Sequence, residues 1–222
     1  MNNTLPVNEI FETMQGEATF TGTPAIFVRL QGCPVGCHWC DTKHTWENKP
    51  EKVIMITGML MKYEDEDTYA QMTVAELMEV FAQLKARHIV ITGGEPCMYD
   101  LNDLTTQIIQ SGRSVQIETS GTFPIRCHPD TFVTVSPKLD MAGGLDVMKE
   151  SYARANEIKF PIGKEVDFQK LAERVMPYVS RETPVWMQPL SQNKSATSLC
   201  VSKATEHNMK VSIQTHKFIG VR

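Results

Sequence analysis

The sequence predicts an α/β protein in which repeated βα units form a mostly parallel sheet, arranged as a partial, incomplete βα barrel. Two observations support this fold class. Short apolar segments rich in β-branched residues alternate with longer segments of helical periodicity, which is the pattern of repeated βα units. A complete eightfold barrel typically needs about 250 residues. This chain has 222 and must also hold a cysteine-rich loop and an irregular region, so we expect one domain spanning residues 1–222.

Seven segments have the composition of β-strands. They are mostly apolar, and each ends at Gly, Pro or a polar residue. Their nearly continuous apolar character is typical of parallel strands that are covered on at least one face. The predicted strands are residues 25–32, 88–94, 115–121, 132–138, 156–161, 184–189 and 210–216.

The clearest predicted helix is residues 73–86. Leu77, Phe81 and their neighbours form one apolar stripe, and Thr73 with Glu76 has the spacing of a capping box. Helical periodicity also occurs at residues 101–108, 168–175 and, more weakly, 196–204. Residues 47–72 have no clear periodicity, and we interpret their acidic run, YEDED, as a solvated loop without a catalytic role.

Composition excludes several classes of function. The net charge of −4 argues against a protein whose main role is to bind nucleic acid directly. The first residues lack a basic stretch followed by an apolar core, and no run of about 18 apolar residues occurs, so neither secretion nor a membrane span is expected. We therefore expect a cytoplasmic protein. In that compartment the six cysteines are expected to be metal ligands or buried thiols rather than disulfides.

Nearly every conspicuous polar motif follows a predicted strand. Because the carboxyl ends of parallel strands meet at one rim, these motifs are expected to share one site and to bind a small molecule. The motifs are residues 33–42, 92–96, 118–121, 136–138, 188–191 and 215–217.

Three cysteines, Cys33, Cys37 and Cys40, lie within eight positions. Thiolates bind zinc or iron-sulfur clusters, and three of them leave one coordination position open. The alternative is a structural zinc site completed by His38 or His44. Zinc sites of that kind usually draw their ligands from two separated pairs, whereas these three share one loop at the expected rim.

The motif Cys33-Pro-Val-Gly-Cys37-His-Trp-Cys40 has the CxxxCxxC spacing of radical S-adenosylmethionine (SAM) enzymes, and residues 93–96 read GGEP, as in that superfamily. Further stretches extend the resemblance over essentially the whole chain: FETMQGE, ARHIVITGGEPC, QIETSGT, VTVSPK, ANEIKFPIG and QTHK. Together they are similar to the 7-carboxy-7-deazaguanine synthases.

The resemblance implies a partial βα barrel of the radical SAM type and a carbon–nitrogen lyase activity. Such an enzyme contracts a ring of 6-carboxy-5,6,7,8-tetrahydropterin to give 7-carboxy-7-deazaguanine, with release of ammonia, in the biosynthesis of queuosine and related 7-deazapurines of tRNA. The implied cofactors are a 4Fe-4S cluster, SAM and Mg2+. A homodimer and a one-electron donor such as flavodoxin are the implied partners.

The resemblance also implies roles for individual residues. Cys33, Cys37 and Cys40 would hold the cluster, whose fourth iron is left for SAM, and Thr42 matches a magnesium ligand. The implied SAM contacts are Trp39, Cys40, Asp41, Gly94, Ser136, Pro137, Lys138, Gln188, Pro189, Leu190 and Ser191. The implied substrate contacts are Met14, Gln15, Gly16, Arg29, Thr92 and His216.

Two of these assignments have a physical rationale. Arg29 lies inside an apolar strand, where an unpaired charge is costly to bury. The pterin carboxylate could accept two hydrogen bonds from its guanidinium in bidentate geometry. The alternative is a structural ion pair with Glu17 or Glu95. Gly94 would let the backbone approach the cofactor because it has no Cβ.

Some positions depart from the family pattern or stay open. Ala18 replaces the second glycine of QGEG, which implies at most a small change in the loop. Glu118 is either a contact to the ribose or substrate, or a structural residue.

Two other functions compete with this reading. A glycyl-radical activating enzyme would share the cysteine and GGEP motifs without needing Arg29, MQGE or QTHK. A zinc module without enzyme activity would need a fourth protein ligand.

Overall fold

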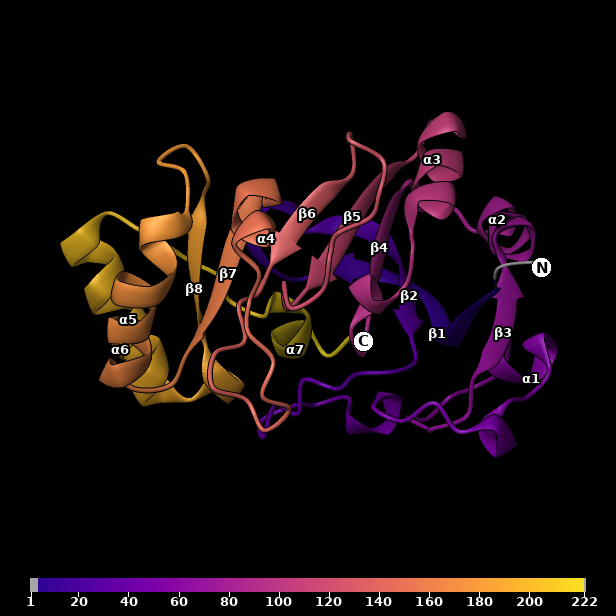
Figure 1. The fold of residues 1–222 in the computed structure, drawn as a ribbon, viewed down its shortest axis with the longest axis horizontal. Coiled ribbons are helices and arrows are strands. Elements are labelled where there is room, and N and C mark those ends of the chain that lie inside the picture. The colour runs from indigo at the N-terminus through magenta and orange to yellow at the C-terminus, as the bar shows by residue number, and fades with distance from the viewer. Residues whose placement is uncertain (1–3, 222) are drawn as a thin grey trace.

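The structure, a computed structural model, describes residues 4–221. Nine strands form one sheet in the order β3-β1-β2-β4-β5-β6-β7-β8-β9 (Figure 1). All neighbouring pairs from β2 to β9 are parallel, whereas β1 pairs antiparallel with both β2 and β3. The strands are β1 (Thr4–Gln15), β2 (Thr23–Leu30), β3 (Ala70–Thr73), β4 (His88–Gly93), β5 (Ser114–Thr119), β6 (Phe132–Val135), β7 (Glu157–Ile162), β8 (Val185–Pro189) and β9 (Lys210–Val211).

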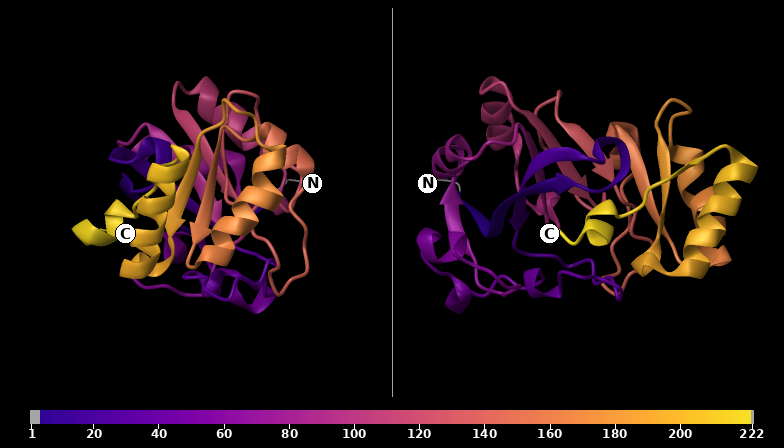
Figure 2. Two further views of the ribbon diagram at one scale, coloured as in Figure 1. Left: turned by 90° about the vertical axis from the view of Figure 1, so that its left-hand side faces the viewer. Right: turned by 180° about the vertical axis from the view of Figure 1, so that it is seen from behind.

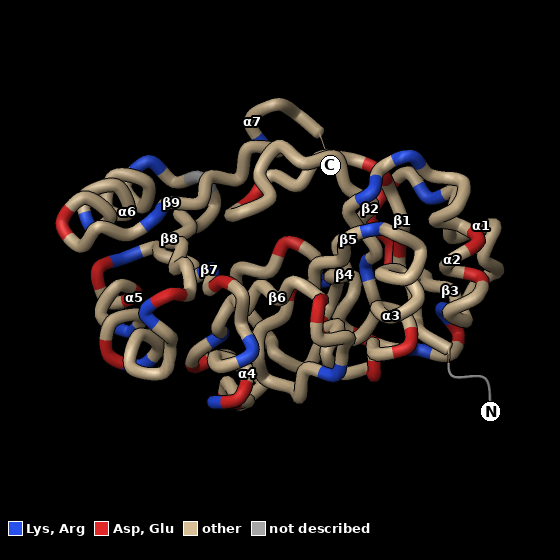
Figure 3. The backbone as a smooth tube through the Cα atoms, turned by 90° about the horizontal axis from the view of Figure 1, so that it is seen from above, with Lys and Arg blue, Asp and Glu red and all other residues tan. Residues whose placement is uncertain are grey.

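The sheet is not closed, because β3 and β9 are its two edges. Seen from above it curves into an arc, with α3, α4 and α5 on its outer side (Figure 3). The short helix α7 lies on the inner side, across the strands from α4 and α5 (Figures 2 and 3). This is the partial βα barrel that the sequence predicts. The helices are α1 (Ile56–Leu60), α2 (Val74–Gln83), α3 (Asn102–Gln110), α4 (Lys149–Arg154), α5 (Glu165–Lys170), α6 (Lys194–His207) and α7 (Thr215–Ile219).

Alternation along the strands separates the core from the inner side of the arc. On β2, Ile26 and Val28 belong to the hydrophobic core, whereas Phe27 and Arg29 face the inner side. On β7, Ile158 and its alternate neighbours are core residues, and Lys159 points inward. Successive side chains of a strand point to opposite faces, so this sheet presents an apolar outer face to the helices and a polar inner face to a cavity.

Two hydrophobic clusters fill the space between the outer face and the helices. One involves β1, β2, β4 and β5 with α2 and α3, and the other involves β6, β7 and β8 with α4, α5 and α6. Helix α5 continues into one π-helical turn at Leu171–Val175, whose buried residues join the second cluster.

The predicted helix at 73–86 begins as expected and ends early. Thr73 and Glu76 form the capping box: the Thr73 hydroxyl accepts from the Glu76 N–H at 3.3 Å, and the Thr73 N–H donates to the Glu76 carboxylate at 2.8 Å. The helix ends at Gln83, because the backbone of Leu84 is extended, and Arg113 donates to the carbonyls of Phe81 and Leu84, at 2.6 and 3.0 Å. Those contacts give hydrogen-bond partners to two carbonyls at the end of the helix.

Five elements are absent from the sequence-based prediction: β1, β3, α1, α4 and α7. The longest is β1. Its polar residues do not give the apolar pattern of a strand, because their side chains find hydrogen-bond partners far away in the sequence. Asn8 donates to the Gln31 side chain at 2.8 Å, and Glu9 accepts from Arg29 at 2.6 Å. The prediction for 210–216 was wrong in its length, because only β9 is strand and α7 begins at Thr215.

The region 47–72 is more ordered than the sequence indicated. It contains a 3-10 turn at Pro50–Lys52, α1, a bridge between Val53 and Tyr69, and β3. The acidic run at its centre is mainly exposed, as expected of a solvated loop. None of the helices within residues 4–221 combines the length and the apolar composition of a membrane span.

Candidate active site

A cavity of about 370 Å³ opens on the inner side of the arc, at the carboxyl ends of the strands. The structure brings nearly all of the predicted site residues to its wall. These are Met14, Gln15, Arg29, Cys33, Cys37, Trp39, Cys40, Asp41, Thr42, Thr92, Gly94, Ser136, Lys138, Gln188, Pro189, Leu190, Ser191 and His216. Gly16 and Pro137 are not on this wall; Pro137 lines a smaller pocket of about 110 Å³ behind Trp39.

The three clustered cysteines line one part of the cavity. The loop that carries them is tied down by backbone contacts: the Cys33 N–H donates to the Trp46 carbonyl at 2.9 Å, and the Cys40 N–H to the Cys37 carbonyl at 3.1 Å. Burial raises the pKa of the Cys33 thiol to about 11 and also raises the pKa of Cys37. Binding of a metal or cluster must therefore release protons from these thiols.

The two histidines nearest the cysteines are placed elsewhere. His38 packs against the Trp39 ring, with centroids 4.3 Å apart, and burial lowers the pKa of His44. Neither is on the cavity wall with the thiols, and no three His, Cys, Asp or Glu side chains within residues 4–221 are grouped closely enough for a single ion. The arrangement is an open set of three thiols beside a cavity.

Gly94 lies against the start of the cysteine loop. A Cβ at Gly94 would come within 2.2 Å of the Gly32 carbonyl oxygen. The Gly94 N–H donates to the Leu30 carbonyl at 2.9 Å, and the Glu95 N–H to the Gly32 carbonyl at 2.8 Å. The close approach that requires glycine here is therefore to the neighbouring loop.

Glu95 of the GGEP motif is a buried anchor, 1% exposed. Its carboxylate accepts from the Thr119 hydroxyl at 2.6 Å and from the Cys97 and Ser120 N–H groups at 2.9 and 2.8 Å. These contacts join the ends of β4 and β5, so the motif fixes the rim that carries the thiols.

Arg29 pairs with a different carboxylate from the two considered in the sequence. Its Nε lies 2.6 Å from Glu9 Oε1, on the adjacent strand β1, so the structural ion pair that was the alternative exists, but with Glu9 in place of Glu17 or Glu95. The guanidinium has four further N–H donors with which it can bind an anion. Arg29 lines the cavity, where an anionic ligand can reach it.

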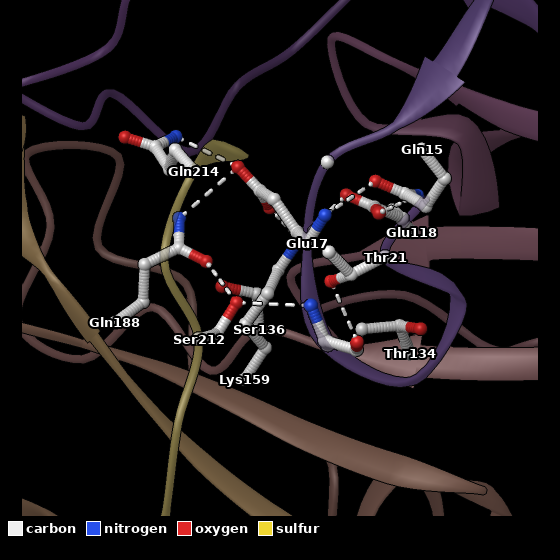
Figure 4. Close-up of polar contacts among 12 residues, drawn as sticks. Gln15, Glu17, Thr21, Glu118, Thr134, Ser136, Lys159, Gln188, Ser212 and Gln214 are labelled. Carbon is white, nitrogen blue, oxygen red and sulfur yellow. Dashed lines mark hydrogen bonds and ion pairs between the residues drawn. The ribbon is translucent and has the colours of Figure 1, made fainter. Parts of the chain in front are cut away.

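Glu17, Lys159 and Glu118 form a buried charged group that the sequence reasoning missed (Figure 4). The Lys159 amino group, 5% exposed as a residue, pairs with Glu17 and lies 2.9 Å from Glu118 Oε2. The only signal in the sequence is Lys159 itself, a charged residue within a mostly apolar strand. Glu118, whose role the sequence left open, thus has a structural partner and also lines the cavity.

Glutamine side chains complete this group. Gln214 and Gln188 donate to Glu17 Oε1 at 2.7 and 3.3 Å (Figure 4). Burial by itself would raise the pKa of Glu17, but the charge and hydrogen bond of Lys159, with Gln214, bring it down to about 2. Burial would lower the pKa of Lys159, and the two carboxylates raise it instead. The cavity therefore holds a charged lysine and an ionised Glu17 at neutral pH.

The C-terminal helix closes one side of the cavity. The Thr215 N–H donates to the Gly16 carbonyl at 3.0 Å, and a Cβ at Gly16 would come within 2.2 Å of His216 Nδ1. An ion pair of 3.4 Å between Lys217 and Asp41 joins the helix to the cysteine loop. Glycine at position 16 therefore leaves the space that the His216 ring occupies. His216 lines the cavity, and burial lowers its pKa.

The alanine that replaces a family glycine has an unusual backbone conformation. Ala18 has φ of 51°, in the left-handed region that favours glycine. Its N–H donates to the Ser212 hydroxyl at 2.9 Å, which holds the turn in place. The glycine conformation is thus kept, with a backbone strain that the sequence did not reveal.

Comparisons with known proteins identify the family of the chain. Residues 27–132 match the Radical SAM superfamily model. The chain is 47% identical to the 7-carboxy-7-deazaguanine synthase of Escherichia coli (strain K12), over 97% of this chain and 98% of that protein. It is 41% identical to the synthase of Buchnera aphidicola subsp. Schizaphis graminum, over 98% and 99%.

The crystal structure of QueE from Escherichia coli matches with a TM-score of 0.92 and 46% identity, over 95% of this chain and 93% of that one. These matches agree with neither the zinc module nor the glycyl-radical activating enzyme. The radical SAM fold and the family resemblance seen in the sequence are confirmed: the chain belongs to the 7-carboxy-7-deazaguanine synthase family of radical SAM enzymes.

Proposed function

We propose that this enzyme contracts a ring of 6-carboxy-5,6,7,8-tetrahydropterin to give 7-carboxy-7-deazaguanine, with release of ammonia, on the route to queuosine. The family assignment gives the reaction type. The observation that carries the proposal is that one cavity is lined by three thiols, by Arg29 and by the Glu17, Lys159 and Glu118 group.

The donor set fits a 4Fe-4S cluster. Three thiols from one loop line a cavity, and the two histidines nearest to them in the sequence, His38 and His44, do not lie on its wall. When bound, the cluster supplies an electron and SAM supplies the group that removes a hydrogen atom from the substrate. Trp39, Asp41, Lys138 and Gln188 are proposed to hold SAM, since they line the wall beside the thiols.

The polar groups of the cavity suit a carboxylated pterin. The Arg29 guanidinium can bind the substrate carboxylate through N–H groups that do not face Glu9. Glu17 and Glu118 are acceptors for the N–H groups at the pyrimidine edge of a pterin. Phe11 and Phe27, stacked with centroids 5.4 Å apart, give the cavity a flat apolar wall.

We also propose that Thr42 contributes to a magnesium site. Its hydroxyl lies 3.6 Å from Cys40 Sγ, on the cavity wall. Magnesium keeps several waters and is often completed by substrate oxygens, so one protein hydroxyl is enough when the substrate is bound.

The family resemblance also supports a proposal for the cellular setting and the assembly of the protein. We propose a cytoplasmic homodimer, each chain a single domain, that receives its electron from a donor such as flavodoxin. The six cysteines are free thiols, in keeping with a reducing compartment, and one continuous sheet of nine strands supports the single domain.

The test is anaerobic reconstitution followed by assay. We expect a protein with about four irons per chain that loses them on Cys37→Ala, while Cys200→Ala, a buried cysteine outside the cavity, keeps them. Incubation with SAM, a reductant and carboxytetrahydropterin should yield the deazaguanine. A protein that binds iron but forms no product would refute the assigned substrate. A protein that binds zinc tightly and no iron would refute the radical chemistry as well.

A further inference from the structure

The Cys40 sulfur has a hydrogen-bond donor of its own. The indole Nε1 of Trp46 lies 3.4 Å from Cys40 Sγ. An indole N–H can only donate, so this contact favours a sulfur that carries negative charge. Trp46 also lines the cavity that holds the three thiols.

Trp46 is fixed in this position by its backbone. Its carbonyl accepts from the Cys33 N–H at 2.9 Å, so one residue contacts both the first and the last cysteine of the loop. The preceding residue, Thr45, is fully buried; its carbonyl accepts from the Gly32 N–H at 2.7 Å, and its hydroxyl donates to the Thr42 carbonyl at 2.8 Å.

The ring has a further support on its face. The Lys43 amino group lies 5.8 Å from the centre of the Trp46 ring, within range of a cation–π contact. The Gln31 side chain, buried under the loop, donates to the His44 and Glu47 carbonyls at 3.0 and 2.8 Å. The segment therefore presents the indole N–H to Cys40 from a rigid support.

We propose that Trp46 is a positioning residue that donates to the Cys40 thiolate of the loaded enzyme and raises the reduction potential of the cluster. Hydrogen bonds to the sulfurs of a cluster stabilise its reduced form, which carries one more negative charge. A higher potential makes the first electron easier to accept. The inference rests on the 4Fe-4S part of the proposed function and is independent of the pterin substrate.

Replacing Trp46 by Phe tests this, because it keeps an aromatic ring and removes the N–H. The matched control is Trp186→Phe on β8, where the indole Nε1 is buried without a hydrogen-bond partner and the ring stacks under Lys210. Both variants and the wild type are reconstituted anaerobically. Iron content is measured, and the cluster potential is determined by redox titration followed by electron paramagnetic resonance, without substrate.

We expect Trp46→Phe to bind wild-type amounts of iron and to be about tenfold harder to reduce, which is a fall of about 59 mV for a one-electron couple. Trp186→Phe should keep the wild-type potential. Full iron with a potential equal to that of the control would overturn the proposal.

If Trp46→Phe loses iron, Trp46→His decides the question, since it keeps a ring N–H. Recovery of iron and potential in Trp46→His supports a role for the N–H, whereas loss of iron in both variants overturns it in favour of simple packing. A wild-type protein that binds no iron would refute the proposed function instead.

Discussion

Replacing Lys159 by methionine is expected to destabilise the protein strongly, because it leaves Glu17 and Glu118 buried without their shared cation. Removing one partner of a buried ion pair costs about 3–5 kcal/mol. The pKa of Glu17 gives a second measure: its fall from 4.5 to about 2 corresponds to roughly 3 kcal/mol at neutral pH. For a chain of this length, a loss of about 3–5 kcal/mol lowers Tm by about 6–20 °C.

The loss of stability in Lys159→Met is also expected to depend on pH. In the wild type the low pKa of Glu17 stabilises the fold above its ordinary value of 4.5, and this contribution disappears as the pH falls toward 2. Without Lys159, burial dominates and the pKa of Glu17 rises above its ordinary value. A carboxyl with a raised pKa destabilises the fold increasingly as the pH rises from the ordinary value of 4.5 toward the raised folded-state pKa. The difference between variant and wild type should therefore be largest at pH 7 and smaller near pH 5.

Thermal unfolding of reconstituted protein, followed by circular dichroism at both pH values, measures this difference. Lys170→Met is the matched control, since Lys170 pairs with Asp140 at 2.7 Å on the surface, where an ion pair contributes about 1 kcal/mol or less. A fall in Tm for Lys159→Met no larger than that of the control would refute the reasoning. So would a difference that stays the same at both pH values.

Three further substitutions test other parts of the site. Gly94→Ala places a Cβ 2.2 Å from the Gly32 carbonyl and should displace the cysteine loop, so most of the iron should be lost; full iron content would contradict this. Gly16→Ala places a Cβ 2.2 Å from His216 Nδ1 and should raise KM for the pterin several-fold at unchanged iron content. An unchanged KM would show that His216 is not needed for binding. Thr42→Ala should abolish any stimulation of turnover by Mg2+ while the cluster remains, and stimulation that persists would place the ion elsewhere.

The sequence predicted the parts of the fold that depend on local pattern. The parallel strands, the capping box at Thr73 and the convergence of the motifs at one rim all follow from periodicity and from the geometry of βα units. The cysteine spacing added the chemistry, because three thiols in one loop restrict the possible metals. These features need only short stretches of chain to be recognised.

Features that depend on distant partners were not predictable in this way. Strand β1 looks too polar until Asn8 and Glu9 are seen to bond with Gln31 and Arg29 of the neighbouring segment. Lys159 and Glu17 are 142 positions apart, and neither carries a local signal of the other. A single sequence gives the type of each residue but not which charge another will meet after folding.

The contact between Thr215 and Gly16 attaches α7 to the cavity rim, so the cavity can open at α7 without unfolding of the core. Helix α7 leaves Phe218 and Ile219 largely exposed, at 69% and 60%, so it buries little apolar surface and is expected to open locally at a small free-energy cost. The strands behind it belong to the hydrophobic clusters and stay closed during such an event. Because His216 and Lys217 of α7 line the cavity, we expect such an opening to widen the access of bulky ligands to it. Backbone amides of α7 should exchange with solvent deuterium long before those of β4 and β5.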